Sequence, residues 1–456
     1  MENTKLRFRE KIAYGIGDLG LTLPEGMIEL LFMKFLTDFH GMTPLLAGAV
    51  LTIMHVYDGF NDVLMGFLAD RTKSRWGSYR PYLIFAAVPF AVIFFFIWHT
   101  PSFLQTQMQL AVYYAIGLIL FDTLDTIIFI PYAALTPRIT RDYDERTKLN
   151  TFRMVFSIAG TMAANTLPSL IIGEMVSAQQ SRILAVAIVV CIISVIAFLS
   201  AGIGTRERIE VSEEHPKILV VAKTALKNKP YILAVLIYLT ANASLTITIT
   251  AMLYYFENSM EIKSTTIPLA LLFIFALLSV PLLWNKLAQK LDKRTAFIIG
   301  ISFMIATRIA IMLLPRTVNV VLLYSLFAVS GVSLGASLSL PWAIIPDTMD
   351  YAELQTGQRH DGALYSLMQL SRKLASSAGP LIIAGGLTFG GYVAGQAIEP
   401  WSKTDLAIRG IIGLVPIIMM LLALWFAIIF PLRREDVDRM GEELAARRNG
   451  TDTGGE

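Results

Sequence analysis

The chain has 456 residues and a formal net charge of +3, and 55% of its residues are apolar while 16% are charged. Soluble globular proteins contain about 45–50% apolar and about 25% charged residues, so this composition places the chain in a lipid bilayer. Little sequence remains outside the apolar stretches, which argues against an enzyme, and the basic residues are dispersed over short loops, which argues against nucleic acid as a partner.

Apolar stretches long enough to cross a bilayer follow one another along the chain. A spanning helix needs about 20 mostly apolar residues, and twelve stretches meet this condition. They are residues 11–38, 44–69, 81–99, 108–135, 150–174 and 182–204 in the first half, and 231–256, 265–285, 295–314, 318–346, 362–392 and 405–431 in the second.

These stretches predict an all-α membrane protein with twelve transmembrane helices. We expect an N-terminal six-helix bundle over residues 1–204, a cytoplasmic middle loop over 205–230, a C-terminal six-helix bundle over 231–431 and a cytoplasmic tail over 432–456. The loops after the second and eighth spans are both basic, as expected of a transporter built from two repeats around a central cavity.

Lysine and arginine in the short loops predict the orientation. The N-terminus, the loops after the even-numbered spans and the tail contain 28 of them, whereas the loops after the odd-numbered spans contain 5. Because these residues mark the cytoplasmic side, both termini are predicted to be cytoplasmic, in a bacterial inner membrane. The first span contains Asp18, Glu25 and Glu29 and lacks a small-residue cleavage site, so we expect a retained helix rather than a signal peptide.

Ionisable residues inside the spans are candidates for function, because a charge in the bilayer interior costs about 3 kcal/mol or more. At about 100° per residue, side chains three and four positions apart share one face of a helix. The shared faces carry Asp18, Thr22, Glu25 and Glu29 on the first span, His55, Asp58 and Asp62 with Asn61 beside them on the second, Asp122, Asp125 and Thr126 on the fourth, and Gln369 and Arg372 with Lys373 beside them on the eleventh.

Two carboxylates one turn apart, Asp58 and Asp62, repel one another unless a cation or a proton lies between them. With the Asn61 amide and the Thr126 hydroxyl they supply oxygen ligands for an alkali cation. We therefore predict a cation site at Asp58, Asn61, Asp62 and Thr126. The spacing leaves the choice between Na+ and H+ open, and no other cofactor is expected.

Structural ion pairs are the alternative to function for the buried carboxylates. Basic partners inside the spans are available in Arg153, Arg308, Arg372 and Lys373. Both interpretations stay open for Glu25, Glu29 and Asp122.

Three segments carry a resemblance to a known family. They read YGIGDLG at 14–20, YDGFNDVLMGFLADRTKSRWGSYRP at 57–81 and DTMDYAELQTGQRHDGALYS at 347–366. They resemble the signatures of the glycoside, pentoside and hexuronide cation symporter family. The resemblance implies the major facilitator fold, alternating access and symport of a sugar with sodium, lithium or a proton.

The resemblance also implies roles for particular residues. The cation-site carboxylates of the family fall on Asp58 and Asp62, its helix 4 threonine on Thr126, its helix 11 lysine on Lys373, and the arginine that borders the sugar cavity on Arg153.

The sugar-binding positions of melibiose carriers match less well. Thr22 and Phe129 stand where those carriers have aspartates, and Ala133 stands where they have a stacking tryptophan. An anionic or differently shaped sugar is therefore as plausible as a galactoside. The candidate substrate-binding residues are Asp18, Thr22, Glu25, Glu29, Asp125, Arg153, Trp342, Gln369, Arg372 and Lys373.

The predicted function is secondary active transport by a monomer: symport of a sugar, glycoside or sugar acid with a cation. One alternative is an amphiphile or lysolipid symporter of the same fold. The other is a membrane receptor without transport, against which the short middle loop and tail argue.

Overall fold

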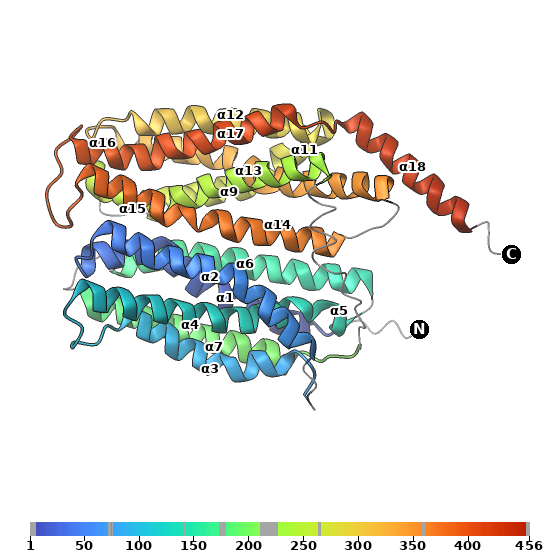
Figure 1. Ribbon diagram of the computed structural model, residues 1–456, viewed down its shortest axis with the longest axis horizontal. Coiled ribbons are helices and arrows are strands. Elements are labelled where there is room, and N and C mark those ends of the chain that lie inside the picture. The colour runs from blue at the N-terminus through green and yellow to red at the C-terminus, as the bar shows by residue number, and fades with distance from the viewer. Residues whose placement is uncertain are drawn as a thin grey trace. The chain divides into compact units, whose positions relative to one another are not determined.

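The computed structural model describes residues 6–71, 74, 76–140, 142–172, 179–209, 227–262, 266–356 and 361–452, and every regular element in these ranges is a helix (Figure 1). Residues 210–226 of the predicted middle loop and 453–456 of the predicted tail lie outside the described residues. The helices of the first half are α1 (Phe8–Lys34), η1 (Phe35–Phe39), α2 (Pro44–Arg71), α3 (Arg80–Trp98), α4 (Gln107–Ala134), α5 (Thr136–Ile139), α6 (Tyr143–Ile172) and α7 (Gln180–Gly204).

The second half continues with helices of the same kind. They are α9 (Lys229–Tyr254), η3 (Tyr255–Ser259), α10 (Thr266–Ser279), η4 (Val280–Trp284), α11 (Asn285–Lys290), α12 (Lys293–Met312), α13 (Val320–Thr356), α14 (Asp361–Ser376), α15 (Ala378–Gly390), α16 (Lys403–Arg409), η5 (Gly410–Leu414), α17 (Val415–Ile429) and α18 (Arg434–Asp452).

Each of the twelve predicted spans coincides with helix in the described part of the chain, which confirms the all-α prediction. Two boundaries differ from it by the largest margins. The tenth span was expected to end at Pro346, but α13 continues through this proline to Thr356. The fifth was expected to begin at 150, but α6 begins at Tyr143. Proline is tolerated inside transmembrane helices, and a polar turn can extend a helix beyond the apolar stretch that identifies its span.

Nine helical stretches in the described residues are long and apolar enough to cross a membrane. The predicted spans outside this set are those on α1, on α2 and on α14 with α15. Of these, α1 carries Asp18, Glu25 and Glu29, and α2 carries Asp58 and Asp62. On α1 and α2, residues singled out as candidates for function therefore contribute to the lower hydropathy of the helix.

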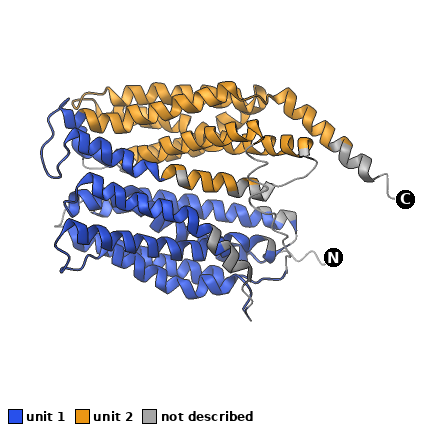
Figure 2. Cartoon of the chain, in the orientation of Figure 1, with its two compact units in different colours: residues 1–213, 252–266, 377–405 blue, residues 214–251, 267–376, 406–456 orange. Residues whose placement is uncertain are grey.

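The chain forms two compact units (Figure 2). Unit 1 consists of residues 1–213, 252–266 and 377–405, so it holds α1 to α7 together with η3 and α15. Unit 2 consists of residues 214–251, 267–376 and 406–456.

Small residues allow close helix packing in unit 1, where α1 packs against α6 and α7, and α2 packs against α4 and α15. A methyl group added at Gly160 of α6 would collide with the Thr22 hydroxyl of α1. At Gly48 of α2 it would collide with the Ala384 side chain of α15 and lie 2.8 Å from the Pro380 carbonyl oxygen. Close backbone approach at small residues is typical of helix packing in membranes, where apolar burial alone does not drive association.

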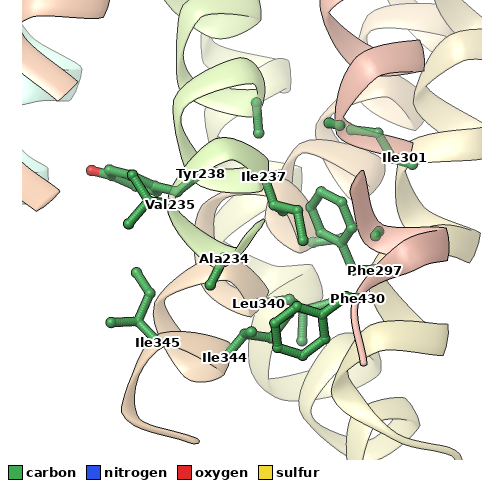
Figure 3. Close-up of a cluster of buried hydrophobic side chains, with 14 of the residues drawn as sticks. Ala234, Val235, Ile237, Tyr238, Phe297, Ile301, Leu340, Ile344, Ile345 and Phe430 are labelled. Atoms are coloured by element: carbon green, nitrogen blue, oxygen red, sulfur yellow. The ribbon is translucent and has the colours of Figure 1, made fainter. Parts of the chain in front are cut away.

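Unit 2 has an apolar core between α9, α12, α13 and α17, and Figure 3 shows part of it. Phe297, Ile301, Leu340 and Ile344 are among its buried side chains. The Tyr238 hydroxyl points away from this cluster in Figure 3. The ring of Tyr238 is thus packed in the core while its hydroxyl is directed away from it.

Candidate cation and substrate sites

The α2 and α4 helices place polar groups against each other inside unit 1. The Thr126 hydroxyl donates to Asp62 Oδ1 at 3.3 Å. Asn61 directly precedes Asp62 on α2, and Asp122 lies one turn before Thr126 on α4. Asn61 Nδ2 donates to the backbone oxygen and to Oδ2 of Asp122, both at 3.2 Å. Asn61, Asp122 and Thr126 are buried, whereas Asp58 and Asp62 are partly exposed. The junction therefore has a packed polar side and a side that remains accessible.

The oxygens of this junction fit a small hard cation. The Thr126 hydroxyl uses its hydrogen on Asp62, so its lone pairs remain available as acceptors. Asp58 lies one turn before Asp62 on the same face of α2. An ionised carboxylate has only acceptor oxygens, which can bind a cation. Of the four residues predicted for the cation site, Asp62 and Thr126 are in direct contact. Asn61 faces Asp122 through its nitrogen, which leaves only its carbonyl oxygen for an ion.

A second pair of acidic residues lies between α1 and α4. The carboxyl groups of Glu25 on α1 and Asp125 on α4 lie close to one another. Oδ1 of Asp125 is buried, with no hydrogen-bond partner among the described residues. Glu29 lies one turn further along α1 and is exposed, as Glu25 is.

Asp18 and Arg153 form an ion pair between α1 and α6. Arg153 Nη2 lies 3.2 Å from Asp18 Oδ1, and the exposed side-chain fractions are 19% and 12%. The guanidinium carbon lies 4.7 Å from the ring centroid of Tyr132. Nε of Arg153 is buried without a hydrogen-bond partner in the described part of the chain. Asp18 therefore neutralises part of the charge of Arg153, while the Nε–H of Arg153 donates to no group among the described residues.

Thr22 has a local role next to this pair. Its hydroxyl donates to the Asp18 backbone oxygen at 2.8 Å and lies against Gly160. The hydroxyl is thus used within α1, and its lone pairs are the part that a ligand can reach.

The remaining candidates lie in unit 2. Trp342 of α13 is exposed and meets Tyr238 of α9 edge to face, with 5.4 Å between ring centroids. On α14, Arg372 Nε donates to Gln369 Oε1 at 3.2 Å. Lys373 follows on the same helix and is partly exposed. The substrate-site candidates of unit 2 therefore comprise one aromatic side chain, Trp342, and two basic side chains, Arg372 and Lys373, together with the Gln369 amide.

Three aromatic residues were missed by the sequence analysis: Tyr14, Tyr132 and Tyr238. Tyr14 precedes Asp18 by one turn, and its hydroxyl lies 2.6 Å from the Thr136 hydroxyl. The Tyr132 hydroxyl donates to the Tyr14 backbone oxygen at 2.7 Å. Helical spacing from Asp18 points to Tyr14, but the contact of Tyr132 with Arg153 depends on packing between α4 and α6.

Comparison with known proteins identifies the family. A model described as MFS/sugar transport protein matches residues 13–434. The chain belongs to this family. It is therefore a multi-pass membrane protein with the twelve-helix fold of the major facilitator superfamily, and a secondary transporter rather than an enzyme.

Individual MFS relatives match over nearly their whole length. An uncharacterized symporter of Synechocystis is 28% identical, covering 97% of this chain and 98% of the relative. The glucuronide carrier protein homolog of Escherichia coli is 27% identical, with 98% and 97% covered. The sodium-dependent lysophosphatidylcholine symporter 1 of Xenopus tropicalis is 25% identical, with 94% and 88% covered.

Solved structures support the MFS fold. The chain is similar to a bacterial homologue of the iron transporter ferroportin, with a TM-score of 0.66 over 93% of this chain and 99% of the other. The sequence identity is 13%, so this likeness concerns the fold alone.

Proposed function

We propose that this MFS transporter is a symporter that couples Na+ or H+, bound at Asp58, Asp62 and Thr126, to uptake of a sugar, glycoside or sugar acid. The contact of Thr126 with Asp62 carries the proposal. It brings two helices together at an oxygen cluster in the membrane interior, where a charge is expensive and therefore a candidate for function.

Coupling follows from the charge of the cation site. With the site empty, Asp58 and Asp62 repel each other at membrane depth, and a bound cation removes this cost. Substrate and cation then need only favour the same conformational state, and each raises the affinity for the other. Asn61 and Asp122, which bond each other beside the site, hold the helices in register and act as positioning residues.

A sugar with an acidic group suits the substrate candidates. Nε of Arg153 is a buried donor without a partner among the described residues, and Tyr132 covers one side of its guanidinium. Glu25 and Glu29 of α1 and Asp125 of α4 provide acceptors for hydroxyl groups. Gln369, Arg372, Lys373 and Trp342 are the corresponding candidates in unit 2.

Names of relatives support both parts of the proposal. The family model is named for sugar transport, one relative is called a glucuronide carrier homolog and another is called sodium-dependent. The last of these moves a lysophospholipid by its name, which makes an amphiphile symporter the second candidate function. The distribution of basic residues supports an inner-membrane location with both termini in the cytoplasm.

The substrate and the ion can be tested together. Methyl glucuronide and methyl glucoside differ in one carboxylate, and lysophosphatidylcholine represents the second candidate. Thermal stabilisation of the purified protein by each compound, in sodium and in potassium, identifies the ligand class. We expect the glucuronide to stabilise most, and more in sodium. Stabilisation by lysophosphatidylcholine alone would establish the second candidate instead.

Coupling is tested by uptake into proteoliposomes with and without an imposed sodium or proton gradient. The wild type should accumulate substrate above equilibrium, and Asp62→Asn should only equilibrate it. Asp438→Asn removes an exposed carboxylate of α18 and serves as the matched control. Undiminished gradient-driven accumulation by Asp62→Asn would refute the cation site.

A further inference from the structure

A buried ion cluster joins the end of α1 to the end of α9 within unit 1. Lys34 Nζ lies 2.7 Å from Asp38 Oδ2 and 2.7 Å from Glu257 Oε2, and its side chain is 3% exposed. The ammonium also lies 5.1 Å from the ring centroid of Tyr254. The Tyr392 hydroxyl donates to both Asp38 oxygens, at 2.9 and 3.0 Å. We call these five residues the latch cluster.

The cluster combines contacts within one helix and contacts between distant segments. Lys34 and Asp38 are one turn apart on α1 and η1, so their ion pair is local. Glu257 and Tyr254 belong to the end of α9 with η3, and Tyr392 follows α15. The contacts of Lys34 with Glu257 and of Asp38 with Tyr392 therefore tie segments from the two halves of the sequence together.

A tight contact between α2 and α15 belongs to the same unit. Gly48 approaches Ala384 and the Pro380 carbonyl so closely that no side chain fits there. The Thr52 hydroxyl donates to the Ser377 backbone oxygen at 3.1 Å. The C-terminal end of α1 and the N-terminal end of α2 thus both contact segments from the second half of the sequence.

The predicted orientation places these helix ends on the extracellular side, since α1 starts in the cytoplasm. In a transporter built from two repeats, alternating access moves one repeat against the other, so a passage to the outside requires these contacts to part. Lys34 keeps Asp38 when this happens, because the pair is local. Glu257 loses a charged hydrogen bond.

We propose that the latch cluster holds the extracellular ends of α1 and α9 together, and that the Lys34–Glu257 ion pair sets the population of the outward-open state. This inference rests on the proposed alternating-access transport. It assigns a role to Lys34, a charge inside the first span that the cation and substrate sites do not use.

The test measures access to a buried reporter. Ser259 is fully buried at the end of η3, and Cys191 is the only cysteine of the chain. Ser259→Cys in a Cys191→Ser background should react slowly with a membrane-impermeant maleimide added outside intact cells. Glu257→Gln should raise the labelling rate roughly tenfold, the equilibrium change expected for a lost charged hydrogen bond.

Matched variants separate the latch from a general loosening. Glu261→Gln removes an exposed carboxylate two residues beyond the reporter and should leave the labelling rate unchanged. Glu257→Asp keeps the charge and should give an intermediate rate. Equal labelling in Glu257→Gln and the parent, or an equal rise in Glu257→Gln and Glu261→Gln, would overturn the proposal.

A milder variant covers the case in which Glu257→Gln does not reach the membrane. Tyr392→Phe removes one hydroxyl and should raise labelling roughly threefold, as expected for one neutral donor lost. An unchanged rate would again overturn the latch. Labelling needs neither substrate nor ion gradient, so its failure is distinct from a failure of the proposed symport.

Discussion

The Thr126 hydroxyl of α4 donates to Oδ1 of Asp62 on α2, with 3.3 Å between the two oxygens. The residues are 64 positions apart in the chain, and each lies on the polar face of its own helix. Their contact makes one oxygen cluster out of two helix faces that the sequence shows only separately.

Replacing Thr126 tests whether its oxygen serves the cation. Thr126→Ala removes the hydroxyl, whereas Thr126→Ser keeps it. A hydrogen bond to a charged group contributes about 1.5–3 kcal/mol, so we expect Thr126→Ala to weaken sodium binding by about tenfold or more. The sodium concentration that half-stabilises the purified protein against heat measures this. Equal values for the alanine and serine variants would show that the hydroxyl is not a ligand.

Breaking the Asp18–Arg153 ion pair should cost more stability when one partner is removed than when both are. Removing one member of a buried pair leaves the other charge uncompensated, at about 3–5 kcal/mol. Asp18→Asn and Arg153→Gln should each lower the melting temperature, and the double variant should recover part of the loss. Asp438→Asn, which disrupts an exposed pair with Arg434, should change stability by less than about 1 kcal/mol. Strictly additive losses at Asp18 and Arg153 would contradict the pairing.

Gly160 tests the packing of α6 against α1. Gly160→Ala places a methyl group against the Thr22 hydroxyl, and overpacking of this kind costs about 1–3 kcal/mol. Thr22→Ala should relieve much of the loss in the double variant. Gly385→Ala is the control, because no atom lies within 4 Å of the added carbon. The measurement is thermal unfolding in detergent. An unchanged melting temperature for Gly160→Ala would show that α1 and α6 move apart easily at this contact.

His40 should make stability depend on pH. It lies just outside the first span, with Nε2 at 2.7 Å from the Tyr114 hydroxyl and 3.0 Å from the Thr100 hydroxyl. Burial lowers the pKa of His40 to about 4, against about 6.5 in an unfolded chain. Between these values the unfolded state binds the proton and the folded state does not, so stability falls as the pH falls.

The size of this effect is about 1 kcal/mol at pH 5 once partial exposure is allowed for. Acidification from pH 7 to 5 should therefore lower the melting temperature of the wild type more than that of His40→Gln. Parallel decreases in the two proteins would assign the pH dependence to other groups.

The membrane class, the twelve helices and the polar faces follow from the sequence because they are local properties. A run of about 20 apolar residues identifies a span, and a period of 3.6 residues puts Asp58 and Asp62 on one face. The same period places Asp18, Thr22, Glu25 and Glu29 along α1. No packing information is needed for either inference.

The partners of these side chains were decided by the tertiary structure. Asn61 faces Asp122, Asp18 meets Arg153, and Lys34 lies between Asp38 and Glu257. Most of these contacts join residues that are 61 to more than 200 positions apart. They depend on which helices are neighbours and on their relative register, and neither the composition nor the periodicity of a single helix specifies that.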